Sequence, residues 1–179
     1  TRELGWDASG ELPSGGRMTE LGVRMIKEMN RCGILIDLAH SNDPCALDAI
    51  EVSEKPVIDT HSNPRALEKE PNPRSIPDEV MKSLSNSGGM LGIIPPIQRP
   101  LNDAPYTSID DDQILVTLQQ IRYAVDLMGP DAVGIGTHFN SAIMPWLTEA
   151  LINDGYSEED TAKIMGGNYL RVLRQVLPE

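Results

Sequence analysis

Residues 34–40 read ILIDLAH, a short run of apolar residues that ends in a histidine. The run follows Gly33, a residue type that suits the end of a preceding helix. A short and almost continuously apolar segment of this kind is typical of a strand buried on both faces of a parallel sheet. Three later runs share this character and predict further strands: 56–61 (PVIDTH), 90–94 (MLGII) and 132–138 (AVGIGTH).

Helical patterns separate these runs. An apolar stripe at helical spacing predicts a helix that begins near Thr19 and ends before Gly33. The stripe consists of Leu21, Met25, Ile26 and Met29. Further helices are expected at 44–52, 77–87, 110–128, 145–154, 157–166 and 168–177. Strands that alternate with helices indicate βαβ units, so we predict an α/β fold with a parallel sheet.

The composition limits the class of protein. The 179 residues are 40% hydrophobic and 23% charged, which is ordinary for one globular domain. We expect a single domain over residues 1–179, with 1–18 as a lead-in loop. The net charge of −12 argues against nucleic acid or an anionic membrane as a partner, because both attract positive surface. The sequence lacks an apolar run of membrane-spanning length and a signal-peptide core, so we expect a soluble protein and favour the cytoplasm.

The chain contains three histidines, and each lies at the carboxyl end of a predicted strand: His40, His61 and His138. The carboxyl ends of parallel strands meet at one edge of a sheet, where active sites form in α/β folds. Imidazole is a common zinc ligand. The pattern therefore predicts a metal site, and the alternative is three neutral histidines that are hydrogen-bonded at strand ends.

Other polar residues lie close to His61 in sequence. Asp59 shares strand parity with His61, so it either faces the same side or orients a histidine from outside the ligand shell. Arg65 and Arg74 follow in the next loop, and a guanidinium group suits bidentate capture of a carboxylate. The alternative for either arginine is a solvated position in the loop.

Five segments, in order, resemble the renal (membrane) dipeptidase family of zinc metallodipeptidases. They are 35–41 (LIDLAHS), 59–67 (DTHSNPRAL), 73–79 (PRSIPDE), 134–140 (GIGTHFN) and 155–172, which includes GGNYLRV. Each match is weak alone, but together they are specific and extend over nearly the whole chain.

The resemblance implies a (β/α)8 barrel of the TIM type that hydrolyses dipeptides with two zinc ions (Zn²⁺) bridged by a glutamate. By resemblance, His40 and His61 would be the two histidine ligands of one zinc. Arg74 would bind the carboxylate of the C-terminal residue of a small peptide substrate.

The chain departs from the family pattern in three ways. The His-x-Asp pair and the bridging glutamate are absent, and four predicted strands supply only a half or truncated (β/α)8 barrel. His138 stands where relatives have an aspartate, so we expect a catalytic proton shuttle there, since imidazole ordinarily ionises near pH ~6.5. The alternative for His138 is a third metal ligand. The loop after Asn140 is short, and Ser141 replaces a glycine.

These departures leave more than one prediction open. Because an open parallel sheet has unpaired edges, we expect either a homodimer or a missing N-terminal half. Zinc-dependent hydrolysis of dipeptides is the leading functional expectation. The alternative is a catalytically degenerate or truncated homologue that acts as a non-enzymatic or partner-dependent module. A weaker option is a different metal-dependent lyase or deaminase on the same barrel.

Overall fold

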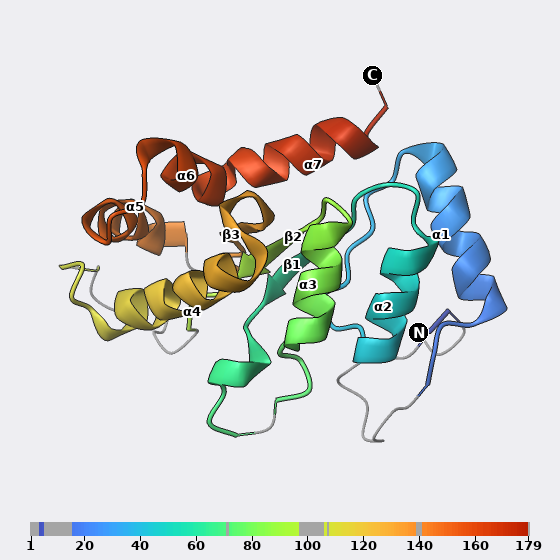
Figure 1. The fold of residues 1–179 in the computed structure, drawn as a ribbon, viewed down its shortest axis with the longest axis horizontal. Helices are drawn as coiled ribbons and strands as arrows, with labels where there is room; N and C mark the ends of the chain where they lie inside the picture. Colours follow the sequence, from blue (N-terminus) through green and yellow to red (C-terminus); the bar gives the residue numbers. More distant parts are fainter. Residues whose placement is uncertain are drawn as a thin grey trace.

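A computed structural model of the protein describes residues 4–5, 16–70, 72–96, 106, 108–138 and 141–178. Three parallel strands form a sheet in the order β1 (Ile58–Ser62), β2 (Met90–Ile93) and β3 (Val133–Ile135) (Figure 1). In the register of the sheet, Ile58 pairs with Met90, and Leu91 pairs with Val133. The expected parallel α/β arrangement is therefore present.

The first predicted strand, 34–40, is shorter than expected. It joins β1 through one bridge, Asp37 to Ile58, in which Ile58 N donates to Ile36 O at 3.0 Å and Leu38 N donates to Ile58 O at 2.7 Å. His40 then adopts a left-handed backbone conformation with φ of 68°, which ends the extended segment. The prediction of an extended segment here was correct, but the predicted strand was too long, because only one bridge joins the segment to β1.

The helices follow the predicted order. They are α1 (Glu20–Cys32), α2 (Asp43–Val52), α3 (Asp78–Asn86), α4 (Asp112–Met128), α5 (Met144–Asn153), α6 (Glu158–Ala162) and α7 (Asn168–Val176). Short 3-10 turns lie at Arg65–Leu67, Pro130–Ala132 and Ser141–Ile143, and a π-helical turn lies at Lys163–Gly167. The side chain of Thr19 caps α1 by accepting from Gly22 N, and Gly33 ends that helix with φ of 66°.

Helices cover both faces of the sheet. On one face, Leu91 and Val133 are buried in a large core with residues of α2, α3 and α4. On the other, Ile58 and Met90 pack against Val172 in α7. Figure 1 shows α7 lying across the amino-terminal side of the strands, where Arg171 donates to carbonyl groups of Gly88 and Asp131. The carboxyl ends of the strands are left for the candidate site.

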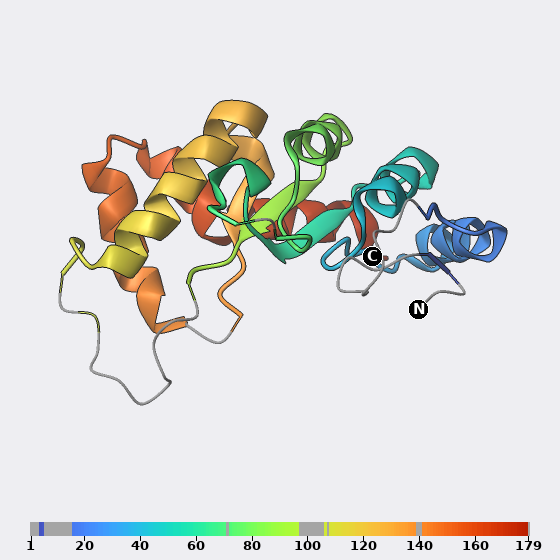
Figure 2. The same ribbon diagram turned by 90° about the horizontal axis from the view of Figure 1, so that it is seen from below.

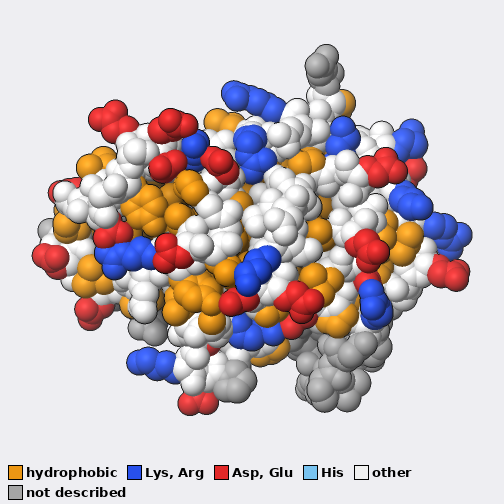
Figure 3. All heavy atoms as spheres, in the orientation of Figure 1, with side chains coloured by type: hydrophobic (Ala, Val, Ile, Leu, Met, Phe, Trp, Pro, Cys, Tyr) orange, Lys and Arg blue, Asp and Glu red, His pale blue; other side chains and the backbone are white. Residues whose placement is uncertain are grey.

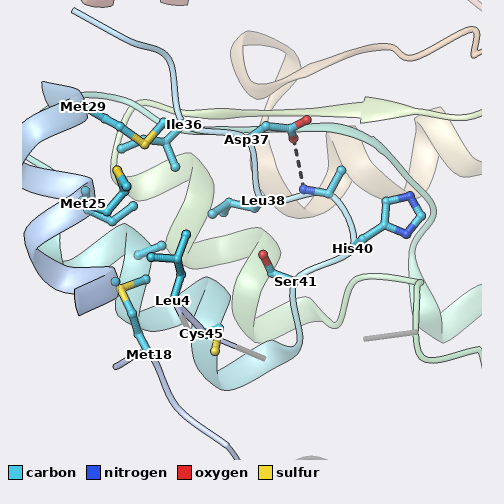
Figure 4. Close-up of a pocket in the computed structure, with 15 residues that line it drawn as sticks. Leu4, Met18, Met25, Met29, Ile36, Asp37, Leu38, His40, Ser41 and Cys45 are labelled. Atoms are coloured by element: carbon cyan, nitrogen blue, oxygen red, sulfur yellow. Dashed lines mark hydrogen bonds between the residues drawn. The ribbon is translucent and has the colours of Figure 1, made fainter. Parts of the chain in front are cut away.

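The apolar stripe of α1 is only partly buried, which differs from the expectation of a core-facing helix. Ile26 is buried, but Leu21 is 45% exposed and Met25 is 42% exposed. Beside them, a cavity of about 390 Å³ separates α1 from the segment that precedes His40 (Figure 4). Of the four residues in the predicted stripe, Ile26 is buried, Met29 is half-buried, and Leu21 and Met25 are exposed.

Candidate functional site

The three histidines lie together at the carboxyl ends of the strands. His61 is in β1, His40 follows the segment bridged to β1, and His138 follows β3. The Nε2 atoms of His40 and His61 are 3.1 Å apart, and the ring centroids of His61 and His138 are 5.0 Å apart. None of the three is visible on the α3 and α4 face, where acidic and basic side chains are interspersed (Figure 3). The strand-end pattern correctly predicted that the imidazoles converge.

Two of these histidines have an uncommon backbone conformation. The φ angle is 68° at His40 and 55° at His138, in the left-handed region that favours glycine. Among the described residues these are the only non-glycine positions with positive φ. Residues held in this conformation cost free energy and cluster at active sites and ligand-binding positions. The backbone conformation and the clustering of the imidazoles therefore both indicate a functional site at the carboxyl ends of the strands.

A hydrogen-bonded chain supports the ring of His61. Its Nδ1 lies 2.8 Å from Oγ1 of Thr60, which donates to Oδ2 of Asp37 at 2.7 Å. Oδ1 of Asp37 accepts from the backbone amides of Ala39 and Thr60, each at 3.0 Å. Sequence analysis did not identify Asp37 and Thr60. Both are polar residues inside apolar runs that end in a histidine: Asp37 lies three residues before His40, and Thr60 lies directly before His61. This position in the sequence was the signal that could have identified them.

Asp59 has a supporting role of a different kind. Its carboxyl is buried, and it accepts from His61 N at 3.2 Å and from Ser62 Oγ at 2.8 Å. Burial raises the pKa of Asp59 to about 7. Asp59 therefore supports the backbone at His61, while the ring of His61 is held through Thr60.

The electrostatic surroundings favour a neutral imidazole at His61. Burial lowers the pKa of His61, and the neighbouring rings of His40 and His138 lower it further. The neutral imidazole is the form that has a lone pair for a metal ion.

The two loop arginines have separate surroundings. Arg65 forms a bidentate ion pair with Asp43, at 2.6 and 2.7 Å, and its Nε donates to Ser75 O at 2.9 Å. Arg74 is exposed, and its guanidinium group makes no hydrogen bond or ion pair within the part of the chain that the structure describes. Of the two candidates, Arg74 therefore has the guanidinium group available for a carboxylate.

A cavity of about 410 Å³ brings Arg74 and the histidines together. Its lining also includes polar groups from the loop after β1 and an apolar wall formed by Ile94, Pro95 and Pro96. This volume lies within the range of small-ligand pockets. The cavity thus places three imidazoles and one guanidinium group around a space that suits a small acidic molecule. Phe139 and Asn140, which belong to one of the quoted motifs, lie outside the described residues.

The spacing of the pair His40 and His61 is compatible with the geometry of a zinc site. Two nitrogens bound to a tetrahedral zinc at about 2.0–2.1 Å lie about 3.3 Å from each other. The Nε2 separation of 3.1 Å between His40 and His61 is close to that value. Over the described ranges, no cluster of three or more His, Cys, Asp or Glu residues is placed to hold a metal ion. The chain therefore fits two positions of a zinc site.

Comparisons with known proteins agree with the quoted motifs. A family model described as membrane dipeptidase (peptidase family M19) matches residues 7–177. The dipeptidase tcpJ of Claviceps purpurea is 32% identical over 177 residues, covering 94% of this chain. A Pseudomonas aeruginosa amidohydrolase structure is 28% identical, with a TM-score of 0.80 over 98% of this chain. A metallopeptidase from Rhodobacter sphaeroides, solved with a phosphinate mimic of the dipeptide L-Ala-D-Ala, is 26% identical, with a TM-score of 0.71 over 89% of this chain.

The relatives are longer than this chain. The matched region is 41% of the Claviceps protein, 62% of the Pseudomonas structure and 47% of the Rhodobacter structure. Within the described part of this chain, no helix combines the length and apolarity that crossing a bilayer requires.

Proposed function

Since this chain belongs to the membrane dipeptidase family, peptidase family M19, we propose that it takes part in zinc-dependent hydrolysis of dipeptides. The observation that carries the proposal is the close pair His40 and His61 beside the available guanidinium group of Arg74 in one cavity. The Rhodobacter relative, solved with a mimic of a dipeptide, supports the substrate class.

Each residue of the cavity has a proposed role. His40 and His61 are the residues that would hold a zinc ion, because their Nε2 atoms are 3.1 Å apart. A bound zinc would polarise the scissile carbonyl and acidify a water molecule. Arg74 binds the terminal carboxylate of the substrate and fixes its orientation. His138 moves a proton between attacking water and leaving amine, because imidazole exchanges protons near neutral pH.

The architecture we propose is the C-terminal half of a (β/α)8 barrel. Support comes from the parallel order of β1, β2 and β3 and from relatives about twice as long. A second copy of the chain, or an N-terminal half, would supply further zinc ligands beside the pair His40 and His61.

Zinc content and turnover test this function. The chain loaded with zinc, alone or with a supplied N-terminal half, should retain the metal through dialysis and hydrolyse members of a dipeptide panel that includes both stereoisomers of Ala-Ala. His40→Ala and His61→Ala should each abolish zinc retention, whereas His138→Ala should retain zinc and lose turnover. Absence of zinc after loading, measured by elemental analysis on a chain with an unchanged circular dichroism spectrum, would contradict the proposal.

A second candidate is a module that keeps the fold without the chemistry. It is favoured by one observation, the incomplete ligand set within the described residues. Zinc retention without turnover of any dipeptide, either alone or with a supplied N-terminal half, would favour this second candidate.

A further inference from the structure

We infer that Thr60 and Asp37 are positioning residues, which hold the ring of His61 in the tautomer protonated at Nδ1 and unprotonated at Nε2. The inference deepens the proposed zinc site. Its principal measurement needs no metal, so its failure is distinguishable from failure of the proposed function.

The hydroxyl group of Thr60 has one proton to donate. Oγ1 of Thr60 is 2.7 Å from Oδ2 of Asp37 and 2.8 Å from Nδ1 of His61. A carboxylate only accepts hydrogen bonds, so the hydroxyl proton points to Asp37. Oγ1 therefore accepts the second hydrogen bond, and the proton in that bond is on Nδ1 of His61.

The orientation of Asp37 is fixed by the backbone. Its Oδ1 accepts from Ala39 N and Thr60 N, and the first of these bonds is the dashed line in Figure 4. Both donors are amides of segments that the bridge between Asp37 and Ile58 holds together. This arrangement leaves Oδ2 as the oxygen that faces the hydroxyl group of Thr60. The two backbone amides therefore determine that Thr60 donates to Asp37 and accepts from His61.

The tautomer of His61 determines the contact with His40. A neutral ring protonated at Nδ1 has its lone pair at Nε2, and this atom is 3.1 Å from Nε2 of His40. Two ring nitrogens at this distance form a hydrogen bond only if one of them donates. In the metal-free chain, Nε2–H of His40 is the donor. The Nε2 atom of His61 thus has the lone pair that a metal ion requires.

Three variants of the full chain separate the contribution of the Thr60 hydroxyl group from that of the Asp37 carboxylate. Thr60→Ser keeps the hydroxyl group and is the matched control. Thr60→Val keeps the shape of the side chain and removes the acceptor for Nδ1–H of His61. In Asp37→Asn, the two backbone amides keep the amide oxygen at the Oδ1 position, so the NH₂ group faces Thr60. The hydroxyl group then accepts from Asn and donates to Nδ1 of His61, which inverts the tautomer.

The experiment is long-range ¹⁵N–¹H correlation NMR of the histidine rings in the metal-free chain at pH ~8, where imidazoles are neutral. The wild type and Thr60→Ser should show His61 protonated at Nδ1 and His40 protonated at Nε2. Thr60→Val should show a mixture for His61, and Asp37→Asn should show protonation at Nε2. A wild-type His61 ring protonated at Nε2, or a Thr60→Val ring unchanged from wild type, would overturn the inference.

Zinc affinity is the second readout. Loss of a hydrogen-bond partner outside the ligand shell ordinarily weakens metal binding about 10–100-fold. Thr60→Val and Asp37→Asn should show a loss of this size relative to Thr60→Ser in competition titrations with a zinc chelator. Equal zinc affinity in all three variants would overturn the positioning role. The predicted tautomers in a chain that binds no zinc would support the inference and refute only the proposed metal function.

Discussion

At the scale of single residues, two arginines that resemble each other in sequence have different surroundings in the folded chain. Arg65 ties the loop after β1 to the first turn of α2 through Asp43 and contacts the carbonyl group of Ser75. Arg74, in the same loop, lines the cavity with its side chain exposed. Substitution of one should change stability, and substitution of the other should change binding.

Arg65→Ala is expected to lower the free energy of unfolding by about 1 kcal/mol, because it removes a half-exposed ion pair and a hydrogen bond. Arg74→Ala should change stability by less than about 0.5 kcal/mol, as is usual for exposed positions. Urea denaturation of both variants measures the difference. Equal losses of stability in the two variants would contradict the assignment of separate roles.

Binding measurements provide the complementary result. Arg74→Ala should weaken the binding of dipeptides that have a free terminal carboxylate. The binding of the corresponding C-terminal amides should be unchanged. Arg74→Lys keeps the charge but loses the bidentate geometry, so it should recover only part of the binding. Equal binding of acids and amides by the wild type would exclude Arg74 as the carboxylate ligand.

Asp48 in α2 is the residue for which the structure predicts a pH effect on stability. It accepts from Arg17 Nε at 3.2 Å and from Met18 N at 3.0 Å, and the hydrogen bond from Arg17 lowers the pKa of its carboxyl. A carboxyl with a lowered pKa in the folded state stabilises the protein above its unfolded-state pKa of about 3.9. That contribution disappears as the pH falls through the folded-state pKa.

Asp48→Asn should therefore lower the melting temperature at pH ~7 by about 2–4 °C, the change that corresponds to about 1 kcal/mol in a chain of this size. The difference from wild type should shrink as the pH falls below ~4. Thermal scans over this pH range check the prediction, with Asp110→Asn, in an exposed turn before α4, as control. A difference that grows in acid would contradict the sign derived from the lowered pKa.

At the scale of elements, the sheet depends on close contacts at its glycines. A methyl group added at Gly92 would collide with the backbone carbonyl of Thr60 and with the hydroxyl group of Tyr169. The same hydroxyl group donates to Thr60 O at 2.9 Å, so α7 is joined to β1 at this point. At Gly134 the nearest obstacle is the flexible end of the Met90 side chain. The space at Gly92 is thus limited by a rigid strand carbonyl, whereas the space at Gly134 is limited by a flexible side chain.

Gly92→Ala should cost about 1–3 kcal/mol of unfolding free energy, as is typical of overpacking. Gly134→Ala should cost less, because the methionine end can move whereas a strand carbonyl cannot. Tyr169→Phe, combined with Gly92→Ala, should not restore stability, since Thr60 O remains in place. Chemical denaturation measures all three, and full recovery in the double variant would show that the hydroxyl group alone limits the space.

At the scale of the whole molecule, several large apolar side chains of the described residues are exposed around α1 and the segment that follows it. Ile34 is 50% exposed at the start of the segment that pairs with β1, and Leu21 and Met25 of α1 are exposed nearby in the chain. Exposed apolar side chains favour association with another apolar surface. We predict that the chain forms a homodimer through these side chains when no N-terminal half is supplied.

Light scattering at micromolar concentration should give a dimeric mass for the wild type. Ile34→Lys should shift the mass toward the monomer, because a charged side chain opposes burial of this exposed apolar position against a second copy. Leu115→Lys places the same charge at an exposed position on α4 and should leave the mass unchanged. A monomeric wild type would contradict the prediction, as would an equal effect of both substitutions.

The sequence by itself determined the elements and the place of the histidines. Helical spacing, caps such as Thr19 and ends such as Gly33 depend on interactions within a few residues, so they can be identified locally. The convergence of His40, His61 and His138 also followed, because parallel strands necessarily bring their carboxyl ends to one edge.

Tertiary structure alone decided which neighbours these residues contact. The hydrogen bond between Asp37 and Thr60 crosses from one segment to the next, and the separation of Arg65 from Arg74 depends on an aspartate in α2. The short pairing of 34–40 results from the turn at His40, and the exposure of α1 results from what packs against it. Such contacts join residues distant in sequence, so they are fixed only when the elements pack and each side chain meets its partner.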